Sequence, residues 1–172
     1  MSDSTANSKV DYAGRTVDLL LLKTILDVPV AMKRMDLDVS NVAGEPMIVS
    51  GVEKMVQRFA VAFLTAMGSA MFRPDHGTRI IPDVAQGRIY NMSTLEASAA
   101  EANMLARTQI KTSDAAADNA GEDTPDDERL VDSEVVDLKF YRASAKATVS
   151  IRLTTAAGSS YTYIIPVAIG VH

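Results

Sequence analysis

A stripe of apolar side chains over residues 52–67 limits the fold of this chain more than any other feature. Its members recur at the i, i+3, i+4, i+7 spacing of one buried helical face: Val52, Met55, Val56, Phe59, Ala60, Phe63, Leu64 and Met67. Burying one large apolar side chain contributes about 1.5–3 kcal/mol, so a stripe of this length can anchor a core. The pattern therefore predicts a helix packed against another layer of structure.

Two local signals predict the ends of this helix. Ser50 and Glu53 form an S-x-x-E pattern, which is typical of a capping box at a helix start. Gly68 follows the last apolar position and is placed to end the helix.

A second helix is predicted from a cap at Ser93 or Thr94 to about Lys111. Its inward face should consist of Leu95, Ala99, Ala102, Leu105, Ala106 and Ile110. Residues 113–128 hold seven acidic and no basic residues, and we expect them to form a solvated acidic loop.

The C-terminal part is rich in β-branched and aromatic residues and predicts three strands, in residues 133–141, 143–156 and 159–171. AAGSS is a credible hairpin turn before the last strand, where Pro166 favours an edge position. Two short strands, Asp36 to Val39 and Met47 to Val49, predict an N-terminal hairpin. The fold class is therefore α+β: an antiparallel C-terminal sheet packed with two main helices, preceded by an N-terminal hairpin and an extended arm.

Composition limits the function classes. With 172 residues the chain fits one domain, which we place at residues 35–172 after a partly mobile, partner-docking extension at residues 1–34. The absence of cysteine excludes disulfides and thiolate chemistry, and two isolated histidines give no zinc spacing. No basic cluster indicates nucleic-acid binding, and no apolar run or leader suggests a membrane or secreted protein, so we expect a soluble one.

The segment FRPDHGTRII, residues 72–81, combines several charged groups with a proline and a glycine. A catalytic role for His76 beside Asp75 is disfavoured, since adjacent turn residues rarely direct both side chains to one point and no nucleophile motif is present. An ordinary helix-exit loop, in which Arg73 or Arg79 pairs with Asp75, Asp83 or the acidic segment, is the simplest interpretation.

The order of motifs resembles the baseplate-wedge family of contractile phage tails. The matching residues are Asp36-Leu37-Asp38, Ser50-Gly51-Val52-Glu53-Lys54, Gln57, Leu64-Thr65, Gly68 and Phe72-Arg73-Pro74-Asp75-His76-Gly77. That family includes the baseplate assembly protein W, has been labelled lysozyme-like and is related to a type VI secretion baseplate subunit. Its Glu-Pro-Arg-hydrophobic element corresponds to Asp127-Glu128-Arg129-Leu130, where Glu128 stands in place of proline.

The resemblance implies a non-catalytic structural subunit of the virion tail baseplate, assembled in the host cytoplasm in six copies per baseplate. Its partners would be other wedge proteins, the tail sheath protein and tube-proximal proteins, with no cofactor and no metal. A structural joint or partner-binding surface would involve Arg73, Pro74, Asp75, Gly77, Arg79 and Arg129. Strand addition to the sheath would use Tyr161, Tyr163 and Ile165, and an apolar run would dock on the wedge: Leu19, Leu20, Leu21 and Leu22.

Two alternative functions stay open. A peptidoglycan glycosidase would need two carboxylates, for which Glu53, Glu96 and Glu101 are the formal candidates. A generic protein-interaction adaptor would share the fold but have neither sheath nor wedge partners.

Overall fold

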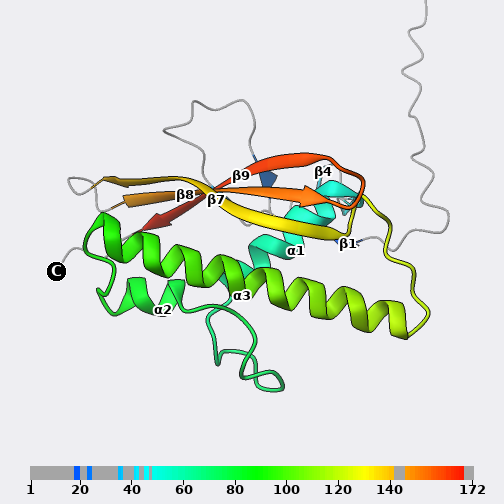
Figure 1. Ribbon diagram of the computed structural model, residues 1–172, viewed down its shortest axis with the longest axis horizontal. Helices are drawn as coiled ribbons and strands as arrows, with labels where there is room; N and C mark the ends of the chain where they lie inside the picture. Colours follow the sequence, from blue (N-terminus) through cyan, green and yellow to red (C-terminus); the bar gives the residue numbers. More distant parts are fainter. Residues whose placement is uncertain are drawn as a thin grey trace, which may run out of the picture.

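A computed structural model describes residues 18–19, 23–24, 35–36, 41–42, 45–46, 48–141 and 146–168. It confirms the α+β class: three helices and a three-stranded antiparallel sheet make up the part from residue 52 onward (Figure 1). The helices are α1 (Val52–Leu64), α2 (Ile80–Ala85) and α3 (Met92–Asn119). The sheet strands are β7 (Leu130–Tyr141), β8 (Lys146–Thr155) and β9 (Ser160–Ala168).

The sheet has the order β7-β8-β9, so β8 is central and Pro166 lies in an outer strand, as predicted. Val149, Ile151 and Leu153 of β8 are fully buried and Arg152 is exposed. Ser150 is also buried, and in this central strand it lies between Asp137 of β7 and Ile164 of β9.

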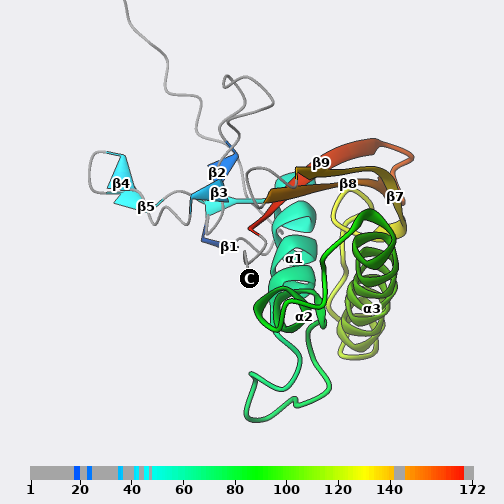
Figure 2. The ribbon, with the colours of Figure 1, turned by 90° about the vertical axis from the view of Figure 1, so that its left-hand side faces the viewer.

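The helices cover one face of the sheet (Figure 2). α3 packs along β7 and α1 packs beside α3. The apolar stripe of α1 supplies the centre of the core, since Met55, Phe59, Ala60 and Phe63 are fully buried. The two phenylalanine rings stack with centroids 6.0 Å apart. The predicted inward face of α3 is also confirmed for Leu95, Ala99, Ala102, Ala106 and Ile110, while Leu105 is half-buried.

Both predicted ends of the first helix are wrong. Gly51, not Ser50, is the N-cap of α1; its φ of 64° suits glycine, and no side chain of the first turn caps it. The helix ends at Leu64, four residues before Gly68, because Thr65 turns extended and its carbonyl accepts the Thr78 amide at 2.8 Å.

The second helix begins and ends differently from the prediction. Asn91 is the N-cap, and its side chain and that of Thr94 satisfy each other's backbone amides in a capping box. The helix continues to Asn119, so the first seven residues of the predicted acidic loop are helical. Alanines favour this continuation, and Asp114 is not solvated but buried against α1.

The predicted N-terminal hairpin is not found among the described residues, because Asp36 and residues 48–49 pair elsewhere; residues 37–39 and Met47 lie outside the described residues. Six two-residue strands pair instead as β1 (Asp18–Leu19) with β6 (Ile48–Val49), β2 (Lys23–Thr24) with β3 (Met35–Asp36), and β4 (Asn41–Val42) with β5 (Glu45–Pro46). β4 and β5 pair with each other, whereas β3 and β6 pair with the short strands before residue 25. Of the predicted wedge-docking leucines, Leu19 lies in β1, and Leu20, Leu21 and Leu22 lie outside the described residues.

Candidate functional site

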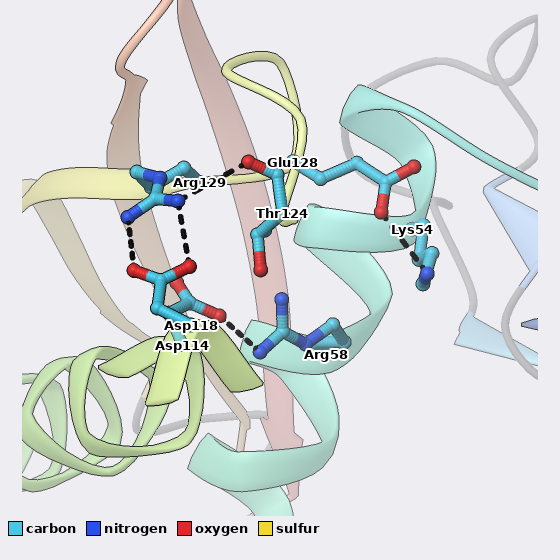
Figure 3. A network of polar contacts seen from close by, with 7 residues as sticks. All are labelled: Lys54, Arg58, Asp114, Asp118, Thr124, Glu128 and Arg129. Atoms are coloured by element: carbon cyan, nitrogen blue, oxygen red, sulfur yellow. Dashed lines mark hydrogen bonds and ion pairs between the residues drawn. The ribbon is translucent and has the colours of Figure 1, made fainter. Parts of the chain in front are cut away.

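Glu128 provides the missing cap of α1. Its side chain is almost completely buried, and its Oε1 accepts a hydrogen bond from the Gly51 amide at 2.9 Å. Its Oε2 lies 3.0 Å from Nζ of Lys54 in the first turn of the same helix (Figure 3). A carboxylate at a helix N-terminus is favourable because the helix dipole is positive there. Glu128 therefore connects the segment before β7 directly to the start of α1.

Two arginines extend this connection to the end of α3 (Figure 3). Arg58 of α1 donates to Asp114 Oδ1 at 2.6 Å, and the pair is mostly buried. Arg129 forms two bonds with Asp118, of 2.7 and 2.9 Å, and also donates to the Thr124 carbonyl at 3.3 Å. We call this set of ionic contacts the polar joint: Lys54, Arg58, Asp114, Asp118, Glu128 and Arg129.

The Arg129 guanidinium holds the pKa of Asp118 below its usual value of 3.8, chiefly through its hydrogen bonds to the carboxylate. The pKa of Arg129 is raised in return by the same bonds. Because a planar guanidinium binds a carboxylate through two parallel bonds, this contact fixes orientation as well as distance. The polar joint thus fastens the start of α1, the end of α3 and the start of β7 to one another.

A second polar arrangement closes the base of the loop at residues 66–78. Met67 N donates to Thr78 O at 2.8 Å, and the Thr78 hydroxyl donates to Phe63 O at 2.6 Å. From α3, Gln109 donates to Gly77 O at 2.9 Å and accepts from Gly77 N at 3.2 Å. The loop base is therefore held to both long helices.

The predicted joint residues do not come together. Arg129 lies in the polar joint beside the start of α1, whereas Arg73 lies in the loop that follows the end of α1. Arg73, Pro74, Asp75 and Arg79 are exposed, and only Gly77 of that segment's predicted residues is buried.

The internal pairing expected for Arg73 and Arg79 is not found. Among the residues that the structure describes, neither arginine forms an ion pair. Asp83 instead pairs with Arg88 at 3.4 Å and accepts from the Ser98 hydroxyl at 3.0 Å.

An open groove of about 1270 Å³ lies between α1, α3 and the loop. Val61, Ala62, Leu105 and Ile110 give it an apolar floor, and Arg73, Asp75 and His76 lie at its loop side. The groove contains no cluster suited to a metal ion, and no group of three potential metal ligands occurs anywhere in the described part of the chain.

The predicted sheath-facing residues lie on β9, where their side chains differ in exposure. Tyr163 and Ile165 face the core, and burial raises the pKa of Tyr163 to about 12. Tyr161 is 40% exposed. A partner strand beside β9 would therefore meet its main chain and its outer side chains rather than Tyr163 or Ile165.

The three glycosidase candidates lie on helix surfaces. Glu53, Glu96 and Glu101 are all exposed, and Glu53 does not have the capping role that the sequence indicated. Sequence reasoning missed Glu128, Lys54 and Gln109. A signal existed for Lys54, since it lies next to the apolar stripe, but nothing local in the sequence indicates the partners of Glu128 and Gln109. No helix in the described ranges combines the length and apolarity needed to cross a membrane.

Comparisons with known proteins give a structural similarity but no sequence match. No protein-family model and no curated protein matches the chain. A crystal structure of a "putative tail lysozyme" from Geobacter sulfurreducens is similar with a TM-score of 0.46 and 16% identity, over 72% of this chain and 96% of that chain. At this TM-score and identity the similarity carries no argument about function.

Proposed function

We propose that this chain is a non-catalytic structural subunit of a contractile-tail baseplate wedge, which links the inner wedge scaffold to the first sheath ring by strand addition. The motif order over residues 35–81 suggests this family. The observation that carries the mechanism is the position of β9: within residues 48–141 and 146–168, it pairs with β8 alone. Its other side is a backbone edge to which a partner strand can add.

The position of Pro166 indicates which amides face that edge. Proline has no N–H, so in an edge strand its nitrogen belongs on the side away from the neighbouring strand. Pro166 pairs with Thr148 of β8, and the two-residue period of a strand gives Thr162 and Ile164 the same orientation. Their amides are therefore the donors available to an added strand, while Pro166 blunts one end of the edge against unspecific pairing.

The polar joint suits a subunit that transmits force. A sheath strand pulling on β9 would load the sheet, and the sheet is fastened to the helices through Glu128 and Arg129. Charge-assisted bonds are roughly twice as strong as neutral ones, so this connection resists displacement of the two layers.

The direct test is recovery of partners from assembling particles. The tagged full-length chain is isolated from cells that produce the tail, and its co-purifying proteins are identified by mass spectrometry. Recovery of wedge and sheath subunits, with no hydrolysis of purified peptidoglycan by the same preparation, is the expected result. Recovery of neither subunit, or hydrolysis that Glu96→Gln or Glu101→Gln abolishes, would refute the proposal.

A further inference from the structure

Two large apolar side chains are almost fully exposed to solvent at the tip of the loop formed by residues 66–78. Met71 is 86% exposed and Phe72 is 93% exposed, the highest values among the exposed large apolar residues of the described chain. An aromatic side chain buries about 150–250 Å² when it is covered, so leaving one uncovered forgoes a large stabilisation. We call Met71 and Phe72 the apolar tip.

The loop that carries the apolar tip has a defined backbone. Its turns are closed by the Arg73 amide on Ala70 O at 3.1 Å and by the His76 amide on Arg73 O at 3.0 Å. Its base is bonded to Gln109, and Gly77, with φ of 98°, approaches Thr65 so closely that a Cβ would lie 2.5 Å from the Thr65 oxygen. A loop held in this way presents its tip with little ordering cost on binding.

Two arginines in and just after this loop have no ion-pair partner among the described residues. Five arginines in the described part of the chain form ion pairs: Arg58, Arg88, Arg107, Arg129 and Arg152. Arg73, next to Phe72, and Arg79, the N-cap residue of α2 just after the loop, are exposed and form no ion pair with any described residue. In a chain of net charge −5, one such arginine in the loop and a second directly after it indicate a carboxylate-bearing partner surface.

We propose that Met71 and Phe72 insert into an apolar pocket on a partner protein whose rim supplies carboxylates to Arg73 and Arg79. Phenylalanine, methionine and arginine are all enriched at protein interfaces relative to the rest of the surface. The inference concerns a surface that the proposed strand addition does not use. Only the expectation that the partner is a wedge neighbour rests on the proposed function.

An anionic membrane is a poorer fit for the same side chains. Membrane-binding basic segments typically carry about four to eight lysines or arginines. The tip region has two, and Asp75 lies exposed beside them on a chain with an overall negative charge.

Site-specific photocrosslinking tests the proposal in cells that assemble the particle. A photoreactive phenylalanine analogue replaces Phe72, and in a matched control it replaces Tyr90, which is 67% exposed but lies outside the loop. The expected result is one discrete crosslinked protein from position 72 and none from position 90, with the crosslinked peptide adjacent to Asp or Glu. No crosslink at position 72, or the same products at both positions, would overturn the proposal.

Substitutions at Met71 and Arg73 then test the apolar contact and the charged contact separately. With the crosslinker at position 72, Met71→Ser and Arg73→Glu should each lower the crosslink yield roughly tenfold or more, while Arg152→Glu should not. All three positions are exposed, so the thermal unfolding midpoint serves as the check that the variants fold. An unchanged yield in Arg73→Glu would contradict the carboxylate rim.

The crosslinked protein also distinguishes the two proposals. A wedge or sheath subunit supports both, and a single partner outside any tail supports the apolar tip while refuting the baseplate assignment. Sedimentation with phosphatidylglycerol/phosphatidylcholine vesicles tests whether the apolar tip binds a membrane instead of a protein. Vesicle binding that Phe72→Ser abolishes would overturn the protein-pocket proposal in favour of a membrane.

Discussion

The carboxylate of Glu128 accepts the amide of Gly51 at 2.9 Å although the two residues are 77 positions apart in the chain. The first turn of α1 therefore receives its cap from the segment that leads into the sheet. The Glu128 amide in turn donates to Pro125 O at 2.9 Å, a bond that proline could not make. Glu128 thus uses both its side chain and its backbone where the resembling family pattern has proline.

Replacing Glu128 with Gln should destabilise the fold. The change keeps the size of the side chain but removes the charge that binds Gly51 N and Lys54, and a hydrogen bond to a charged group contributes about 1.5–3 kcal/mol. Urea unfolding should show a loss of this order. Glu122→Gln, on an exposed residue of the same acidic segment, is the control and should change the free energy of unfolding by less than about 0.5 kcal/mol. Equal losses of unfolding free energy in the two variants would contradict a stabilising role for the Glu128 contacts.

Arg129→Ala should raise the pKa of Asp118. The depressed pKa comes first from the Arg129 hydrogen bonds, so the carboxyl should return toward 3.8 when they are lost. A depressed folded-state pKa contributes stability above the unfolded value of 3.8, and this stability disappears as pH falls through the lower folded value. The free energy of unfolding should therefore fall less for the variant than for the wild type as the pH is lowered from about 4.

NMR titration of the Asp118 side chain measures this shift directly. Asp132 is the internal control, because its pKa is lowered by Arg107 rather than by Arg129. If the variant changes the pKa of both Asp118 and Asp132, or of neither, the pairing with Arg129 does not cause the low pKa of Asp118.

Gly77→Ala should destabilise the chain more than Gly68→Ala does. Both glycines have positive φ, 98° and 83°, which costs an alanine roughly 1–2 kcal/mol. At Gly68 nothing lies within 4 Å of the added Cβ, whereas at Gly77 the Thr65 oxygen lies 2.5 Å away. The Gly77 variant should therefore lose a further 1–3 kcal/mol, roughly, from overpacking, measured by thermal or urea unfolding. Equal losses would mean that the loop base adjusts freely.

These residues also show what the sequence could and could not predict. The stripe of α1 and the three C-terminal strands were predictable, because apolar periodicity and β-branched composition report burial locally. The end of α1 at Leu64 was not, since the apolar pattern continues to Met67 while the backbone bonds to Thr78. The continuation of α3 past Lys111 brings Asp114 against Arg58, a partner 56 positions away in the chain. Such long-range polar partners leave no mark on a local pattern.

The candidate site divides in the same way. The sequence predicts Arg129 in a joint, and its contact with Asp118 does connect α3 to the segment before the sheet. Arg73, predicted in the same joint, lies exposed in the loop at residues 66–78. The exposure of Met71 and Phe72 could not be derived from the sequence, because a local pattern does not show whether apolar loop residues face the core or the solvent.

Tyr163 should make the fold sensitive to high pH. Burial raises its pKa to about 12 from an ordinary value of 10.0, so its stabilising effect is complete below pH 10 and is lost as pH rises to about 12. The loss should be on the order of 1–3 kcal/mol. Urea unfolding between pH 9 and 12 should show a smaller decrease for Tyr163→Phe than for the wild type. Identical pH dependence in the two proteins would contradict the burial-driven shift.

Thr162→Pro should block strand addition at β9 while leaving the sheet intact. By the two-residue period from Pro166, the Thr162 amide faces the open edge, so its removal costs no bond to β8 but removes a donor for a partner strand. Thr162→Ala is the matched control, because it shortens the exposed side chain and keeps the amide. Calorimetric titration with purified sheath protein should show binding to the wild type and the alanine variant and at least roughly tenfold weaker binding to the proline variant. Far-UV circular dichroism and the unfolding midpoint should be alike for all three. Undiminished binding by a folded Thr162→Pro variant would mean that the sheath attaches elsewhere, because an added strand cannot pair fully with an edge that lacks this donor.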